Sequence, residues 1–357
     1  MAGPPPVVAR ARRAVRAALA ERLEQLADDT GSGHLAPRLL VGVSGGADSL
    51  ALLATTCWVG ERMGLATEAA IVDHGLQDGS ASVAARAAAQ AERLGAEAHV
   101  LTPSVDLAAP GGLENAARTA RHDALEHLAR ERGALAVLLG HTLDDQAEQV
   151  LLGLARGSGT RSLAGIPARG TLPGGAAVVR PLLGLGRADT EAICRWAGLT
   201  WFEDPHNRDP ALLRSRVRTR VLPALEDPDA GLGPGVRAGL VRTAAIAAED
   251  AAALEAWAGA EVTRLRVDPP ARDPRVVSLD LDALAALPAA VRHRVIARAA
   301  RAAGGQAPPR ERILAVDALV TGARAGGTSA GPVELPGGVA AHRACARLDL
   351  IPRLPGP

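Results

Sequence analysis

The sequence predicts an α/β protein: a doubly wound parallel sheet followed by a smaller, mainly helical α+β C-terminal domain. In the first part of the chain, short apolar runs alternate with stretches of helical periodicity. Several of those runs end in glycine-rich or polar residues. After residue 226 the alternation stops and alanine-rich helical stretches follow. Strands that alternate with helices of this length are typical of βαβ units.

The elements of the first domain are expected in a simple order. An amphipathic helix at residues 10–27 comes first, with Val15, Leu19 and Leu23 on one face. Because the carboxyl ends of parallel strands meet at one edge of a sheet, the residues that follow each strand should converge on one site. Apolar runs predict strands at residues 39–43, 69–72, 99–101, 135–139 and 178–179, with helices at 49–63, 80–94, 113–132 and 143–155.

The domain boundary is expected in a segment rich in proline and glycine. Asp227-Pro228-Asp229 and the Gly-Leu-Gly-Pro-Gly run at 231–235 are typical of a linker. We therefore expect a first domain at residues 1–228 and a second at 236–357. In the second, strands are expected at 333–335 and 348–351.

The composition excludes several kinds of chemistry. Of the 357 residues, 48% are hydrophobic and 22% charged, which is enough to bury a sizeable core. All 40 basic residues are arginine, so the chain has no lysine for a Schiff base or for gripping phosphate. The net charge of +1 neither demands nor forbids a nucleic-acid partner.

The cysteines and the apolar runs indicate a reducing compartment. Cys57, Cys194 and Cys345 are far apart, which excludes a four-cysteine zinc or iron–sulfur site from one chain. The N-terminus lacks the apolar segment of a signal peptide, and no run of about 18 apolar residues predicts a membrane span. We expect a cytoplasmic protein that does not bind membranes.

A glycine-rich loop follows the first strand. It reads Ser44-Gly45-Gly46-Ala47-Asp48-Ser49, and a helix comes next. Such loops bind phosphate because glycine lets backbone N–H groups approach the anion and the helix N-terminus adds positive potential. This loop lacks the lysine of a Walker A motif and the spacing of a dinucleotide fingerprint. Since a carboxylate repels phosphate, Asp48 is expected to hold a Mg²⁺ ion that the phosphates share.

Carboxylates gather after the fourth strand. His141 precedes Asp144, Asp145 and Glu148, whose spacing places them on one helical face. Helix-dipole pairing accounts for one acidic residue in a first turn, but less easily for three. A metal–phosphate site or a general base is the favoured interpretation.

Two groups of arginines complete the candidate site. Glu114, Arg118 and Arg121 share a helical face; an ion pair is the simple interpretation, and stabilisation of a transferring nucleotidyl group is the functional one. Arginines also alternate from Arg214 to Arg220, which would circle a helix rather than line one face. Contact with phosphate or RNA is favoured for them.

Together these residues resemble the PP-loop ATP pyrophosphatases and, within them, the tRNA(Ile)-lysidine synthases. The resemblance runs in family order over residues 38–225. It implies the adenine nucleotide alpha hydrolase-like fold. The motifs that carry it are Ser44-Gly45-Gly46-x-Asp48-Ser49, Asp73-His74-Gly75-Leu76, Glu114-x-x-x-Arg118-x-x-Arg121, Gly140-His141-x-x-Asp144-Asp145-Gln146-x-Glu148, Arg156-Gly157-Ser158-Gly159, Arg180-Pro181-Leu182-Leu183, Asp204-Pro205-x-Asn207, Arg214-Ser215-Arg216-Val217-Arg218 and Leu222-Pro223.

The resemblance implies an ATP-dependent ligase that forms a carbon–nitrogen bond. In this family ATP adenylates O2 of the first anticodon cytidine of tRNA(Ile) with a CAU anticodon and releases pyrophosphate. Free L-lysine then attacks C2 and displaces AMP, which changes the codon read from AUG to AUA. ATP and Mg²⁺ are the implied cofactors, and a homodimer remains an open alternative.

The resemblance also implies roles for residues. Asp48 would hold Mg²⁺ with the pyrophosphate, Arg121 would stabilise the α-phosphate, and Asp145 would bind metal or take the proton of lysine. Four positions depart from the family pattern, at Gln77, His122, Gln149 and Ser215, and none removes a group assigned to chemistry. Nucleotide binding is implied for Ser44, Gly45, Gly46, Ala47, Asp48, Ser49, His74 and His141, and substrate or tRNA contact for Arg118, Asp144, Glu148, Arg214, Arg216 and Arg218.

Three alternatives remain at this point. A PP-loop tRNA 2-thiolase would need persulfide or cluster-bearing cysteines, and the three cysteines offer no such pair. A small-molecule amide synthetase would lack the arginine run and would usually carry a glutaminase domain. A non-catalytic RNA-binding protein would not need the carboxylates, and would keep its function after Asp48→Asn or Asp145→Asn.

Overall fold

The chain forms two compact units, at residues 1–247 and 248–357, and each is described by itself. The division falls within helix α10 (Val236–Leu265), after the glycine-rich segment in which the sequence places the boundary. The computed structural model describes residues 3–27, 37–73, 75, 79–105, 112–157, 159–204, 209–268, 275–322 and 332–353.

The first unit is built on a six-stranded sheet with the order β3-β2-β1-β4-β6-β5. Neighbouring strands are parallel from β3 to β6, which confirms the predicted parallel sheet. The expectation was incomplete at one edge: β5 pairs with β6 in the antiparallel sense. Three residues that include a glycine carry too little periodicity to predict that strand. The strands are β1 (Arg38–Val43), β2 (Ala66–Val72), β3 (Glu97–Leu101), β4 (Ala134–Leu138), β5 (Arg169–Thr171) and β6 (Ala177–Val179).

The helices of this unit follow the predicted order, with additions after the fourth strand. Helix α5 has the predicted bounds, and α1 begins earlier than expected, at a proline that suits a first helical position. Apart from the helix expected to carry the arginines at 214–220, the helices after α5 were not predicted. The helical segments are α1 (Pro6–Ala27), α2 (Ala47–Met63), α3 (Ser80–Arg93), α4 (Gly112–Glu131), α5 (Leu143–Ala155), α6 (Thr160–Leu163), α7 (Arg187–Trp196), α8 (Leu213–Arg216), the π-helical turn η2 (Val217–Val221) and α9 (Leu222–Glu226).

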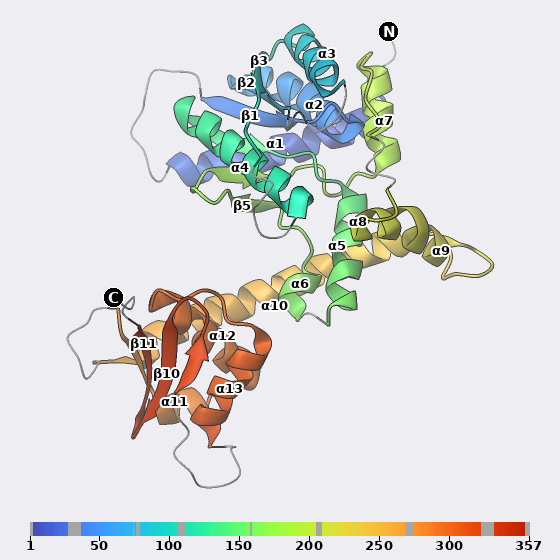
Figure 1. Ribbon diagram of the computed structural model, residues 1–357. Helices are drawn as coiled ribbons and strands as arrows, with labels where there is room; N and C mark the ends of the chain where they lie inside the picture. The colour runs from blue at the N-terminus through green and yellow to red at the C-terminus, as the bar shows by residue number, and fades with distance from the viewer. Residues whose placement is uncertain are drawn as a thin grey trace. The chain divides into compact units, whose positions relative to one another are not determined.

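Helices cover both faces of the sheet, as a doubly wound fold requires (Figure 1). On one face, α1, α2, α3 and α7 bury the larger core, which includes Leu19, Leu53 and Ile193. On the other face, α4 packs Leu125 and Leu128 against the sheet. Strands β1 and β4 are neighbours although two strands separate them in the chain. At such a switch point the connecting loops diverge and leave a crevice where ligands bind.

Glu68 in β2 anchors an ion-pair network within the sheet. Its side chain is 2% exposed and accepts bonds from Arg38, His99 and Arg132. Ligand atoms of Glu68, Glu97 and His99 lie within 4.8 Å of one another, a spacing that a metal site would also have. Because Arg132 donates to both carboxylates, the protein's own cations already neutralise them. The cluster is therefore structural, consistent with the general preference of buried charges for paired partners.

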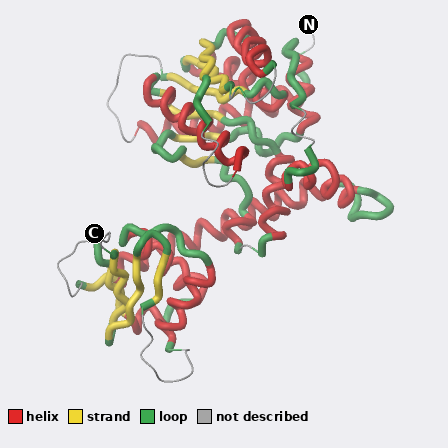
Figure 2. Tube along the Cα trace, viewed as in Figure 1, coloured by secondary structure: helices red, strands yellow, loops and turns green. Residues whose placement is uncertain are grey.

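The second unit has a five-stranded antiparallel sheet with the order β7-β8-β11-β10-β9; the strands of both sheets are yellow in Figure 2. The predicted strands at 333–335 and 348–351 are present, and three more join them. Helices α11 to α13 bury Val291, Ile296 and Leu319 against it. Its elements are β7 (Arg266–Val267), β8 (Val277–Asp280), α11 (Leu281–Ala285), α12 (Ala289–Ala302), α13 (Arg310–Thr321), β9 (Val333–Leu335), β10 (Val339–Ala344) and β11 (Arg347–Pro352).

Within the described ranges, none of the helices combines the length and the apolar character that crossing a membrane requires.

Candidate active site

A cleft of about 1370 Å³ opens at the carboxyl ends of the strands in the first unit. Its wall includes the glycine-rich loop after β1, Asp73 after β2, and Gly140 and His141 after β4. Residues from α4, α5, α7 and α8 complete the wall. The structure thus brings together clusters that are far apart in the sequence.

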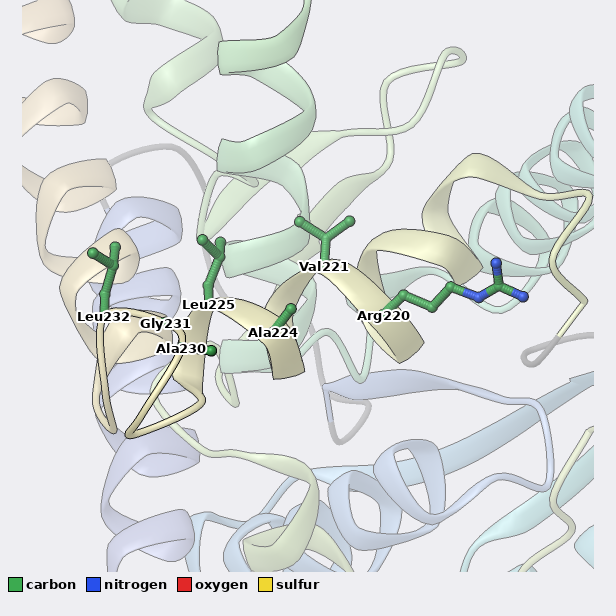
Figure 3. Close-up of a pocket in the computed structure, with 7 residues that line it drawn as sticks. All are labelled: Arg220, Val221, Ala224, Leu225, Ala230, Gly231 and Leu232. Atoms are coloured by element: carbon green, nitrogen blue, oxygen red, sulfur yellow. The ribbon is translucent and has the colours of Figure 1, made fainter.

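A separate hollow of about 580 Å³ lies between α9 and the loop that follows it (Figure 3). Val221, Leu225 and Leu232 give it an apolar lining, and Arg220 extends away from the leucines. It shares no lining residue with the cleft and carries none of the predicted catalytic groups.

The glycine-rich loop is held by its own serines. The Ser49 hydroxyl donates to the carbonyl of Gly46 at 2.9 Å and accepts the N–H of Ser44 at 3.1 Å. Gly45 has φ +81°, a conformation that disfavours other residues. The loop is therefore preformed around the first turn of α2, where N–H groups and the helix dipole favour an anion.

Asp48, in the first turn of α2, is held from helix α7. The Thr190 hydroxyl lies 2.5 Å from Asp48 Oδ1, and Arg187 Nη1 lies 3.3 Å from Oδ2. Burial raises the pKa of Asp48, while Thr190 and Arg187 act in the opposite direction. The sequence interpretation missed both α7 residues. Only the turn Gly186-x-x-Asp189, typical of a helix start, signalled the helix that carries them.

The end of β4 packs directly on the glycine-rich loop. A Cβ atom at Gly140 would lie 3.0 Å from the carbonyl oxygen of Asp48, so only glycine allows this approach. His141 follows, and its Nδ1 is buried without a hydrogen-bond partner in the described part of the chain. Burial lowers the pKa of His141 to about 4, with Arg180 and Arg214 acting in the same direction and Asp145 against it. The imidazole is therefore neutral at pH 7.

The α5 carboxylates are paired with arginines of α8 and of the π-helical turn η2. Glu148 has a fully buried side chain and accepts Arg214 Nε at 2.8 Å and Arg218 Nε at 2.5 Å. Asp145 Oδ1 accepts from the same two arginines at 3.1 and 3.3 Å. Its Oδ2 accepts the N–H of Thr142 at 2.8 Å, which caps α5. Two carboxylates and two guanidinium groups thus neutralise one another.

Asp144 occupies a different position from its neighbour. Its Oδ2 accepts the backbone N–H of Arg187 at 2.8 Å, and its Oδ1 lies 3.1 Å from Arg237 Nε. Arg237 also pairs with Glu226. Asp144 therefore joins the start of α5 to the start of α7.

The alternating arginines divide by position along α8 and η2. Arg214 and Arg218 face α5, whereas Arg216 is exposed and donates to the carbonyl of Pro210 at 3.2 Å. Arg220 lies in the hollow of Figure 3. The run does surround the helix, as expected, and the π-helical turn lies within it. Such turns are frequent at functional sites.

On the α4 side, the cleft is lined by several arginines. Arg118, Arg121 and Arg180 all line the cleft, and none pairs with a carboxylate among the described residues. The pKa of Arg121 is lowered, first by partial removal of the guanidinium group from water and then by the charges of Arg118 and Arg214. The residue still keeps exposed surface. Burial, then Arg118 and Arg121, also lowers the pKa of His122. Like charges held this close indicate a binding site for an anion.

Some predicted site residues cannot be placed. His74, Pro205 and Asn207 lie outside the described residues, and nothing is described of the Glu114 side chain. Asp73, beside His74, is 9% exposed and accepts the N–H of Gly75 at 2.9 Å.

Asp48 suits a Mg²⁺ ligand better than Asp145 does. Mg²⁺ is usually bound by one or two carboxylates together with substrate phosphates. Asp48 opens on the cleft beside the phosphate-binding loop and meets a single guanidinium group. Both carboxylates already accept donors at both oxygens, but Asp145 accepts from two cations, whereas Asp48 accepts from one cation and from the neutral Thr190 hydroxyl. The donor set therefore fits one metal ion at Asp48.

Two of the three free cysteines are unsuited to sulfur transfer. Burial raises the pKa of Cys57 and of Cys194 to about 12, so both are protonated at neutral pH. Cys194 donates to the carbonyl of Ala47 at 3.3 Å. Because the thiolate is the nucleophile, neither thiol is activated.

Comparison with known proteins identifies both parts of the chain. Residues 15–225 match a PP-loop domain family, and residues 279–348 match a TilS substrate binding domain family. A tRNA(Ile)-lysidine synthase of Salinispora tropica is 46% identical over 98% of this chain and 98% of its own length. One of Leifsonia xyli subsp. xyli is 48% identical over 84% of this chain and 85% of its own length.

A solved structure supports the fold alone. The U34-tRNA thiolase NcsA from Methanococcus maripaludis, solved with its [4Fe-4S] cluster, has a TM-score of 0.53. It is 19% identical and covers 68% of this chain and 79% of its own.

Proposed function

The chain belongs to the tRNA(Ile)-lysidine synthase family, and from that premise we propose that it ligates free L-lysine to the first anticodon cytidine of tRNA(Ile) with a CAU anticodon. ATP would supply the energy and leave as AMP and pyrophosphate. The ligase activity follows from the family, and the assignment of individual residues rests on the cleft.

The observation that carries the proposal is the chemistry of the three parts of one cleft. The loop after β1 suits the phosphates of ATP, and the arginines of the α4 side, which have no carboxylate partner in the described part of the chain, suit the anionic RNA. On the α5 side, Asp145 lines the cleft, and the ammonium group of lysine could replace one of the two guanidinium groups that Asp145 now meets. A ligase that joins an amine to RNA needs all three.

In the first step, O2 of the cytidine attacks the α-phosphorus of ATP and the bond to the β-phosphate breaks. Pyrophosphate leaves in the glycine-rich loop, held by backbone N–H groups and the Ser44 hydroxyl, while Ser49, proposed from the sequence as a further donor, could join only by releasing the carbonyl of Gly46. When bound at Asp48, Mg²⁺ would draw charge from the phosphates and make pyrophosphate a better leaving group. Arg121, which pairs with no carboxylate among the described residues, stabilises the negative charge that develops on the α-phosphate.

In the second step, the ε-nitrogen of lysine attacks C2, the C2–O2 bond breaks, and AMP leaves with O2. The amine must first lose a proton, since its ordinary pKa is about 10.4. Asp145 is our candidate for the group that takes it, because it is the more exposed carboxylate of the α5 pair. Glu148, fully buried between Arg214 and Arg218, is assigned to positioning.

The contacts also revise the RNA assignments. Arg214 and Arg218 are engaged with carboxylates, so we assign them to holding the lysine site. Arg118, Arg180 and the exposed Arg216 are the candidates for RNA phosphate. The target base must leave its stack to reach the cleft.

A lysine-incorporation assay tests the proposal. Purified protein with ATP, Mg²⁺, labelled lysine and tRNA(Ile) bearing CAU should attach label to RNA. A tRNA(Met) with the same anticodon is the matched control and should remain unlabelled. Sulfur transfer without lysine incorporation would instead support a thiolase, which the protonated Cys57 and Cys194 disfavour.

A further inference from the structure

One face of helix α7 contacts the first turn of α2 through three side chains. Arg187, Thr190 and Cys194 are spaced by three and four residues, which places them in one row along the helix. Arg187 and Thr190 reach the two oxygens of Asp48, and Cys194 reaches the carbonyl of Ala47. Thr190 and Cys194 are fully buried. The row therefore contacts the phosphate-binding loop at Ala47 and at Asp48, and Asp48 carries the one carboxylate of that loop.

The two side chains that hold Asp48 each make a second contact. The Thr190 hydroxyl lies 2.8 Å from the carbonyl of Arg187, so its single proton has an alternative when it leaves Asp48. Arg187 Nε donates to Glu191 at 2.9 Å, closer than the 3.3 Å contact with Asp48. Thr190 can thus release Asp48 without leaving an unsatisfied buried donor, and Nη1 of Arg187 can turn to water because that side chain is 40% exposed.

Helix α7 is itself fixed at its start. The backbone N–H of Arg187 donates to Asp144 at 2.8 Å, and Asp189 accepts the N–H of Gly186 at 3.1 Å. Asp189 also pairs with Arg10 of α1 at 2.6 Å. Because this helix turn is fixed, a side chain of the turn can set the orientation of a carboxylate to which it donates.

We propose that Thr190 and Arg187 are positioning residues for Asp48, in an inference that rests on the proposed function. Thr190 orients the carboxylate toward the metal-bound phosphates of ATP. Arg187, which Glu191 holds through Nε, supplies the counter-charge of Asp48 when no metal is bound. Neither residue touches the reacting atoms; both act through Asp48.

Thr190→Val tests the first part, because valine keeps the volume and removes the hydroxyl. We expect the affinity for Mg²⁺ with α,β-methylene-ATP, measured by calorimetry, to fall about tenfold, as loss of one hydrogen bond to a charged group predicts. Affinity for the nucleotide without Mg²⁺ should change less than twofold. Thr190→Ser, which restores the hydroxyl, should return the wild-type value.

Thr56→Val is the matched control. Thr56 is also fully buried and lies in α2, but its hydroxyl has no hydrogen-bond partner among the described residues. It should bind Mg²⁺ and the nucleotide like the wild type. The proposal is overturned if Thr190→Val binds normally, if Thr56→Val loses as much, or if metal-free binding falls equally.

Arg187→Gln tests the second part and remains informative if Thr190→Val does not fold. Loss of the counter-charge should weaken metal-free nucleotide binding several-fold and leave Mg²⁺-dependent binding near the wild-type value. Equal losses with and without Mg²⁺ would show that Arg187 binds phosphate directly, and would overturn its role. Because these are binding measurements, they stand even if the wild-type protein fails to incorporate lysine, a failure that would refute the proposed function alone.

Discussion

The α5 and α4 sides of the cleft differ in how their charges are paired. On the α5 side, Asp145 and Glu148 are each held by Arg214 and Arg218. On the α4 side, Arg118 and Arg121 line the same cleft without a carboxylate among the described residues.

This difference in pairing distinguishes arginines that stabilise the fold from arginines that bind an anionic ligand. Amino-acid composition alone does not make that distinction. Paired charges stabilise each other, so the α5 side should be rigid before any ligand binds and should lose stability when one partner is removed. Unpaired like charges repel, so the α4 side should gain from an anionic ligand and should tolerate loss of a charge. The role of an arginine in this cleft therefore depends on which groups its side chain faces. Its residue type alone does not decide whether it is functional or structural.

The largest effect is expected from Glu148→Gln. The substitution leaves Arg214 and Arg218 without their buried counter-charge, and should lower the free energy of unfolding by about 3 kcal/mol. Partial exposure of both arginines keeps the loss from being larger. Urea denaturation measures it, with the exposed Glu61→Gln as the control that should change little. A Glu148→Gln variant as stable as the wild type would remove the distinction between the two sides.

A loss of similar size, but in rate, is expected from Arg121→Gln. Removal of one group that stabilises charge in the transition state should lower the rate of adenylation about 100-fold. The unfolding free energy should not fall, because Arg121 pairs with no carboxylate in the part of the chain that the structure describes. Release of labelled pyrophosphate measures the rate, and the exposed Arg13→Gln on α1 is the control. A stability loss that accounts for the lower rate would contradict the assignment.

A smaller effect is expected in the pH dependence of stability, through His141. The pKa of His141, about 4, lies below its ordinary value of 6.5, so the unfolded chain binds a proton that the folded chain does not. Stability should therefore fall as the pH falls from 6.5 through 4. Histidine chemical shifts measured by NMR should place the titration of His141 well below pH 6. A midpoint at or above 6.5 would mean that the carboxylates dominate its surroundings.

The sequence predicted the elements with strong periodicity and the loops between them. Helix α5 has the predicted bounds, and the glycine-rich loop follows β1 as expected. Periodicity failed for β5, whose three residues are too short for a pattern. It also failed for α7, a ten-residue helix whose start is marked only by Gly186 and Asp189.

The sequence predicted which residues belong to the candidate site better than it predicted which of them contact one another. Asp145, Glu148 and Arg214 were all identified, but spacing along the chain did not show that the arginine faces the carboxylates instead of RNA. Thr190 was missed because a buried threonine has no signature until its partner, Asp48, is known. Contacts between elements are set by tertiary packing, which local patterns do not encode.

The central claim, that pairing divides the arginines by role, is tested most directly by comparing Arg118→Gln with Arg214→Gln. For each variant, tRNA(Ile) affinity would be measured across a salt series and stability by urea denaturation. We predict that Arg118→Gln is as stable as the wild type and lowers the salt slope of tRNA binding by about 1, as loss of one phosphate contact requires. Arg214→Gln should be destabilised and keep the wild-type slope. The account is contradicted if Arg118→Gln is the destabilised variant, or if only Arg214→Gln changes the slope.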